Sequence, residues 1–96
     1  MIKHVVLAKF KPGVTADQIA ELKKSLGTLP GIIPEIKGYY FGQDVRVEKT
    51  LDFALVSTFA DMAAVKRYLV QPDHVAVGRY IRSLCESLQI IDFEHE

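Results

Sequence analysis

Residues Ile2-Lys3-His4-Val5-Val6-Leu7-Ala8-Lys9-Phe10-Lys11 open the chain with a segment that is apolar on both of its faces. Side chains alternate between the two faces of a β-strand, so His4, Val6 and Ala8 share one face while Val5 and Leu7 lie on the other. A strand of an antiparallel sheet in a monomer would instead have one apolar face and one polar, solvated face. This stretch therefore predicts a sheet that is covered on both sides.

The rest of the chain predicts further helices and strands around this first strand. Thr15 and Gln18 form a capping box, and Pro72 interrupts the second helical region. We expect a helix from Thr15 to Leu29, strands over residues 35–42 and 51–59, helices over residues 61–70 and 73–88 with Asp61 and Asp73 as N-caps, and a strand over residues 88–94. The order βαββαβ is the ferredoxin-like α+β arrangement, with a four-stranded antiparallel sheet. The 96 residues are enough for one domain, residues 1–96.

The second face of this sheet requires a partner. Helices cover one face only, and apolar side chains left in water would each cost roughly 1.5 to 3 kcal/mol relative to burial. The simplest partner is an identical sheet, which gives a two-fold dimer. We therefore predict a homodimer in which two sheets form an α+β barrel.

Composition and charge exclude several classes of function. Lysine plus arginine and aspartate plus glutamate are equal at 12 each, so no basic field favours nucleic acid as a partner. No apolar run approaches the roughly 20 residues of a membrane span, and the start of the chain lacks the cleavage region of a signal peptide. We expect a cytoplasmic protein without a membrane partner. The single cysteine, Cys85, excludes an internal disulfide and falls on a buried position.

Three residues are candidates for acid-base chemistry. Tyr68 and His74 lie on either side of the break at Pro72, at a corner between two helices, and His4 lies within the first strand. An imidazole titrates near neutrality and can accept a proton from carbon or oxygen, while a phenol can bind a carbonyl oxygen. The spacing alone leaves a structural role open for each of them, with His74 bound to local backbone and Tyr68 and His4 packed in the core or interface.

Other polar residues give weaker indications. Asp52 and Asp92 each lie in an apolar strand, where an acid usually pairs with a lysine, an arginine or a backbone amide. No pair of histidines or carboxylates has the spacing of a metal site, so we predict no metal and no cofactor. Tyr39 and Tyr40 are interpreted as packing residues of the sheet.

Several segments together resemble the stress-responsive A/B barrel (Dabb) family. They are Lys3 to Lys11, Asp52 to Phe59, Tyr68 to Val75, and Leu88 to Phe93 with Arg82-Ser83, so the resemblance covers nearly the whole chain. Members of this family are dimeric α+β barrels. Some plant relatives bind magnesium through backbone carbonyls after the first helix, here residues 30–36, a mode of binding that leaves no side-chain pattern.

The resemblance also implies a chemistry. A plant polyketide cyclase of the family carries the strand histidine, the tyrosine and the histidine after the proline, which implies His74 as general base, Tyr68 as its hydroxyl partner and His4 as a lining residue. The implied function is a cofactor-free acid-base enzyme with a small-molecule pocket, acting by aldol chemistry on a carbonyl-bearing or phenolic compound. Two alternatives stay open: a non-catalytic, stress-associated ligand-binding or structural dimer, and a cofactor-free monooxygenase.

Overall fold

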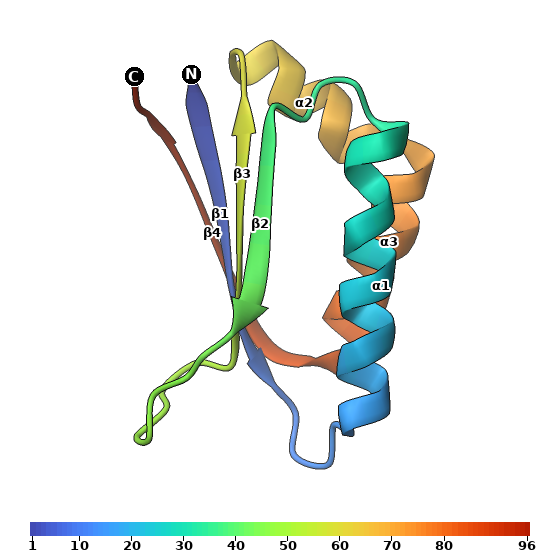
Figure 1. The fold of residues 1–96 in the computed structure, drawn as a ribbon, viewed down its shortest axis with the longest axis vertical. Helices are drawn as coiled ribbons and strands as arrows, with labels where there is room; N and C mark the ends of the chain where they lie inside the picture. The colour runs from blue at the N-terminus through green and yellow to red at the C-terminus, as the bar shows by residue number, and fades with distance from the viewer.

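A computed structural model describes all 96 residues and confirms the ferredoxin-like α+β fold (Figure 1). Its elements are β1 (Ile2–Phe10), α1 (Ala16–Ile32), β2 (Gly38–Gln43), β3 (Phe53–Phe59), α2 (Met62–Val70), α3 (Pro72–Leu84) and β4 (Cys85–Glu94). The strands form one antiparallel sheet in the order β2-β3-β1-β4, and the three helices lie on one side of it. No helix is long and apolar enough to cross a membrane.

The strand at the N-terminus lies inside the sheet, between β3 and β4. His4 pairs with Ser57 on β3 and with Asp92 on β4, and Val6 pairs with Leu55 and with Ile90. These side chains belong to the inner face, which the helices cover, and His4, Val6 and Leu55 are buried. The core lies between this face and the buried sides of the helices, including Leu22, Leu26, Leu29, Val65, Tyr68 and Ile81.

The opposite face of the sheet, which we call the outer face, has no layer of the chain over it (Figure 1). Val5 pairs with Val56 and with Ile91, and Tyr40 pairs with Val56, so these four side chains share the outer face. Lys3 on β1 pairs with Phe93 on β4, and both lie on the same face, next to Val5 and Ile91. Tyr40, Ile91 and Phe93 are exposed in the single chain. The prediction of strands that are apolar on both faces is therefore confirmed.

Helix α1 begins as predicted but ends later. Thr15 Oγ1 accepts a hydrogen bond from the backbone of Gln18, and the Gln18 side chain accepts one from the backbone of Thr15, which completes the capping box. The predicted end before Pro30 is wrong, since the helix continues through Pro30 to Ile32. Proline removes one hydrogen bond of the helix, but Leu29 and Ile33 are buried and their packing outweighs that loss.

The corner between α2 and α3 differs from the prediction in its cap. Asp61 caps α2 as expected, but Gln71, not Asp73, caps α3, because its side-chain oxygen accepts the hydrogen bond of the His74 backbone. Pro72 is the first residue of α3, where its missing N–H leaves no helical bond unmade. One proline therefore ends α2 and begins α3.

The buried side of α2 consists of Ala64, Val65 and Tyr68, so Tyr68 points into the core. Other boundaries were predicted wrongly. Helix α3 ends at Leu84 and β4 begins at Cys85, because Cys85 pairs with Phe10 across a register shift. Strand β2 begins at Gly38, after a turn in which the Ile36 N–H donates to the Ile33 carbonyl.

Candidate functional site

A cavity of about 60 Å³ lies between the corner of α2 and α3 and the inner face of the sheet. The structure brings all three predicted site residues into its wall: His4 from β1, Tyr68 from the last turn of α2 and His74 from the first turn of α3. The remaining lining is mostly apolar and includes Val6, Leu26, Leu55, Leu69, Val77, Ile81, Leu88 and Ile90. The mixture of a few polar groups in an apolar wall is typical of small-molecule sites.

His74 has one ring nitrogen fixed by the backbone. Its Nδ1–H donates to the carbonyl oxygen of Leu69 at 3.3 Å, and a carbonyl can only accept, so Nδ1 carries the proton and Nε2 is left as the basic nitrogen. Burial lowers the pKa of His74 below its ordinary value of 6.5, and the nearby charges of His4 and Arg82 lower it further, against the opposing effect of the Leu69 carbonyl. The neutral ring that a general base requires is therefore the stable form at pH 7.

His4 is held by an acid from the neighbouring strand. Its Nδ1 lies 2.5 Å from Asp92 Oδ1, and the side chain is only 3% exposed. The carboxylate accepts the Nδ1 proton, and Nε2 has no partner in the chain. Every fully buried side-chain nitrogen and oxygen in the structure has a partner, so this Nε2 belongs to the cavity wall and not to closed packing.

Tyr68 lies between the two imidazoles. Its ring centroid is 4.0 Å from that of His74 and 6.0 Å from that of His4. Its hydroxyl pairs with the hydroxyl of Tyr39 at 2.8 Å, whereas the expected hydrogen bond between Tyr68 and His74 is not formed. The two residues meet through their ring faces instead.

The two phenols stay protonated over the physiological range. Burial, reinforced by the neighbouring Tyr39, raises the pKa of Tyr68 far above its usual value, and burial raises the pKa of Tyr39 to about 12. Neither hydroxyl can therefore serve as a base near pH 7. Each can donate a hydrogen bond, and a Tyr68 hydroxyl that accepts from Tyr39 keeps its own hydrogen for the oxygen of a ligand.

Replacing Tyr39 by phenylalanine is expected to lower the free energy of unfolding by about 1 to 2 kcal/mol, because the Tyr68 hydroxyl loses its partner while it stays buried. Tyr68→Phe should cost a similar amount, and the double variant should cost little more than either single change. Urea unfolding of the four proteins measures this coupling. Tyr80→Phe is the matched control, since the Tyr80 hydroxyl donates to the Gln18 carbonyl in a separate, exposed hydrogen bond and its effect should add to that of either change. Fully additive effects would contradict a shared hydrogen bond.

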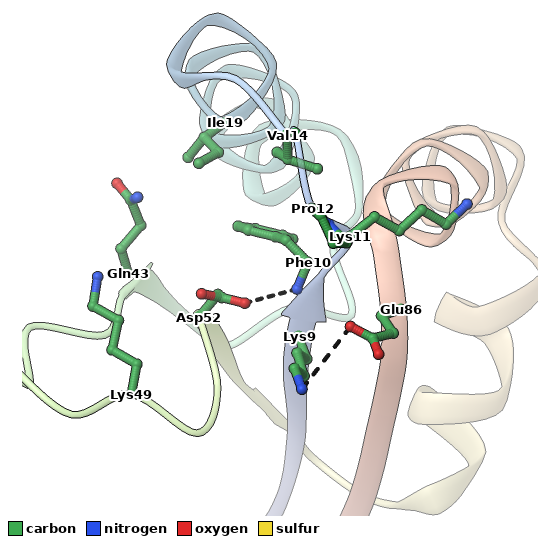
Figure 2. A pocket seen from close by; sticks show the side chains of 11 residues that line it. Lys9, Phe10, Lys11, Pro12, Val14, Ile19, Gln43, Lys49, Asp52 and Glu86 are labelled. Carbon is green, nitrogen blue, oxygen red and sulfur yellow. Dashed lines mark hydrogen bonds and ion pairs between the residues drawn. The ribbon is translucent and has the colours of Figure 1, made fainter.

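A larger hollow of about 530 Å³ lies at the other end of the sheet, where β1 ends and α1 begins (Figure 2). Its walls are mainly charged or polar and carry Lys9, Lys11, Lys49, Asp52 and Glu86. Lys9 pairs with Glu86 at 3.9 Å, and the Asp52 carboxylate accepts the backbone N–H of Phe10 at 2.8 Å. This open hollow has no histidine beside a buried hydroxyl, as the smaller cavity has in His74 and Tyr68. The smaller cavity is therefore the better candidate for chemistry.

Two residues of the site were not recognised in the sequence. Asp52 pairs with a backbone amide as expected, but Asp92 pairs with a histidine, and Tyr39 is more than a packing residue. Asp92 and Tyr39 occupy positions of their strands whose side chains point to the inner face of the sheet. An acid at such a position needs a buried partner. No group of three histidine, cysteine, aspartate or glutamate side chains is arranged to hold a metal ion.

Comparison with known proteins identifies relatives along the whole chain. The chain is 32% identical over 96 residues to the stress-response A/B barrel domain-containing protein HS1 of Arabidopsis thaliana, covering 97% of this chain and 88% of the relative. It is 34% identical over 95 residues to olivetolic acid cyclase of Cannabis sativa, covering 96% of this chain and 94% of the cyclase.

Solved structures show the same fold. A dimeric ferredoxin-like protein of unknown function from Thermobifida fusca superposes with a TM-score of 0.90 at 30% identity, covering 98% of this chain and 90% of that chain. An antibiotic biosynthesis monooxygenase, with a TM-score of 0.80, is only 15% identical over 100% of this chain and 99% of its own, so it shares the fold alone. The profile of the stress responsive A/B barrel domain matches residues 2–95. The chain belongs to the stress responsive A/B barrel domain family.

Proposed function

We propose that this protein is a cofactor-free acid-base enzyme that acts on a small carbonyl-bearing or phenolic compound, with His74 as the general base. The observation that carries the proposal is the state of the His74 ring. Its Nδ1 is fixed on the Leu69 carbonyl, its pKa is lowered by burial, and it lies beside a protonated phenol at an apolar cavity. Such a ring is neutral at pH 7 and is held in one orientation by the backbone.

The proposed reaction begins with proton removal next to a carbonyl. The C–H bond breaks, Nε2 of His74 takes the proton, and the electron pair moves into an enolate whose oxygen becomes negative. The hydroxyl of Tyr68 donates to that oxygen and stabilises the charge. In an aldol cyclisation the enolate carbon then attacks a second carbonyl of the same molecule, and His74 returns its proton to the new alkoxide. His4, oriented by Asp92, lines the opposite wall.

The size and wall of the cavity limit the substrate. A volume of about 60 Å³ is well below the usual range of ligand pockets, which starts at roughly 300 Å³. It accommodates the reacting carbonyl end of a molecule, while the remainder would lie outside, next to an apolar lining that includes Val77, Leu88 and Ile90. A compact apolar or phenolic compound with one exposed end fits this arrangement best.

We further propose that the working protein is a homodimer that pairs the outer faces of two sheets. Val5, Val56 and Ile91 form an apolar strip that no part of the chain covers, and Tyr40 beside them is 72% exposed. Related structures at 30% identity, from Bacteroides fragilis and Thermobifida fusca, are described as dimeric. Joining two such faces would bury side chains that otherwise remain in water.

One observation favours a second candidate function, ligand binding without turnover. The Tyr68 hydroxyl is paired with Tyr39 and not with His74, so the arrangement also satisfies the buried polar groups in the absence of any substrate. In that case the same wall would hold a small apolar or phenolic ligand, and no bond would change. The two functions differ in whether a proton is exchanged.

Hydrogen exchange distinguishes the two candidates. The protein is incubated in D2O with acetophenone or 4-hydroxyacetophenone, and loss of the methyl proton signal is followed by NMR beside an equal concentration of free imidazole. Exchange that saturates with ketone and exceeds the imidazole rate by at least about 100-fold supports the enzyme. Saturable shifts of the Tyr68 and His74 signals without exchange support the binding protein. Neither exchange nor binding would contradict both functions for this ligand class.

A further inference from the structure

The connection between β2 and β3, residues 44–52, which we call the arm, carries two apolar side chains that touch nothing. Val45 is 95% exposed and Val47 is 100% exposed. They alternate with the charged residues Arg46 and Glu48. Two valines that are almost fully exposed and so close together on one projecting segment are characteristic of a contact surface, since burial of their side chains is favourable.

The base of the arm is fixed by hydrogen bonds. The Asp44 N–H donates to the Asp52 carbonyl at 2.8 Å, and the Arg46 N–H donates to the Asp44 carboxylate at 2.8 Å. Asp52 in turn donates its N–H to the Ala8 carbonyl, and its carboxylate accepts the Phe10 N–H, each at 2.8 Å (Figure 2). The arm therefore leaves the end of the sheet in a defined direction. Figure 1 shows that this direction is away from the helices, toward the side of the outer face.

The outer face has shallow hollows next to the base of the arm. One of about 230 Å³ is lined by residues that include Leu7, Leu51 and Ala54, and another of about 310 Å³ by residues that include Tyr40 and Val56. Asp44 and Leu51, at the base of the arm, line the first hollow, but Val45 and Val47 are almost fully exposed and fill neither hollow of their own chain. In a face-to-face dimer, the arm of a second copy would bring the same two valines to this face.

The dimensions fit such an exchange. Two packed sheets lie about 10 Å apart, and the extended chain from Asp44 to Glu48 spans up to about 13 Å. An arm that starts at the edge of one sheet is thus long enough to cross the interface and reach the facing sheet. In a two-fold dimer each subunit then gives one arm and receives one.

We propose that the arm clasps the partner subunit, with Val45 and Val47 packed against the partner's outer face. This inference rests on the homodimer of the proposed function, which it extends by assigning a dimer contact outside the sheet. Val45 and Val47 have no packing role within their own subunit, so substitution there changes the interface without changing the fold.

Sedimentation of the variant Val45→Ser/Val47→Ser tests the proposal. We expect the dissociation constant of the dimer to rise at least 10-fold, with an unchanged free energy of unfolding for the monomer. Val70→Ser is the matched control, because Val70 is also an exposed valine but lies at the end of α2, in the helix layer, and should leave the constant unchanged. A dimer whose constant stays within twofold in the arm variant would overturn the clasp while the dimer itself stands. A monomeric wild-type protein would instead overturn the dimer, and the clasp with it.

Limited proteolysis gives an independent readout. Arg46 and Lys49 offer trypsin two cleavage sites on the arm. Cleavage there should be at least 10-fold slower in the wild-type dimer than in a monomeric variant such as Ile91→Asp, because the partner covers the arm. Equal rates in the two proteins would contradict the proposal even if the serine substitutions weaken the dimer.

Discussion

Replacing Ile91 by aspartate is expected to dissociate the homodimer, with a rise of at least about 100-fold in its dissociation constant. Ile91 pairs with Val5 in the middle of the apolar strip on the outer face. A buried, unpaired carboxylate costs about 3 to 5 kcal/mol, and two-fold symmetry places one on each subunit. Since 1.4 kcal/mol is a tenfold change, one such charge already accounts for 100-fold. Sedimentation or light scattering over a concentration series measures the effect.

The control places the same charge on a comparable exposed valine elsewhere. Val70 is 75% exposed at the end of α2, in the helix layer, so Val70→Asp should leave the dissociation constant unchanged. If Ile91→Asp stays dimeric at micromolar concentration, the two subunits do not meet through the outer face. If both variants dissociate, a general effect of added charge is responsible instead.

Substituting His74 by glutamine is expected to lower the rate of proton exchange by about 100-fold to 10,000-fold, the usual contribution of a positioned general base. Glutamine preserves polarity and much of the volume of the ring but cannot accept a proton. The deuterium exchange assay with acetophenone measures the loss. His95→Gln, the same substitution in the exposed C-terminal tail, should keep the wild-type rate. Exchange that persists in His74→Gln would assign the proton transfer to another group, with His4 the next candidate.

The pH dependence follows from the lowered pKa of His74. The neutral ring is the active form, so the exchange rate should stay level at pH 7 and decline only as pH falls through a folded-state pKa below 6.5. Below pH 6.5 the unfolded chain binds a proton at this residue that the folded chain resists, so stability should also decrease as pH falls toward the folded pKa. His74→Gln should remove this part of the decrease. A rate that rises on acidification would contradict the role of His74 as base.

The fold could be predicted because its pattern is local. The capping box at Thr15, the break at Pro72 and the alternation along β1 each depend on residues a few positions apart. Strands that are apolar on both faces can be recognised without knowing which strands lie next to each other in the sheet. The errors lie where distant contacts decide. Helix α1 passes through Pro30 because Leu29 and Ile33 pack in the core, and β4 begins early because Cys85 pairs with Phe10.

The site was predicted less completely, for the same reason. Family resemblance and the proline corner indicated His4, Tyr68 and His74, and the structure places all three at one cavity. Their partners come from other strands: Asp92 is 88 residues from His4, and Tyr39 is 29 residues from Tyr68. Only the register of the sheet and the orientation of α2 bring these pairs together. The catalytic roles and the cytoplasmic location stay predictions.

Strand β4 is bonded to β1 along one side only, and its ten residues form an edge of the sheet. Nearly every side chain from Glu86 to Glu94 is exposed, on both faces of the strand. A long, flat edge with free backbone groups is a template onto which another chain can add in extended form. A partner does not change this, because a dimer that pairs outer faces leaves both β4 edges open. Growth into larger assemblies should therefore start at β4 in the dimer as readily as in the single subunit.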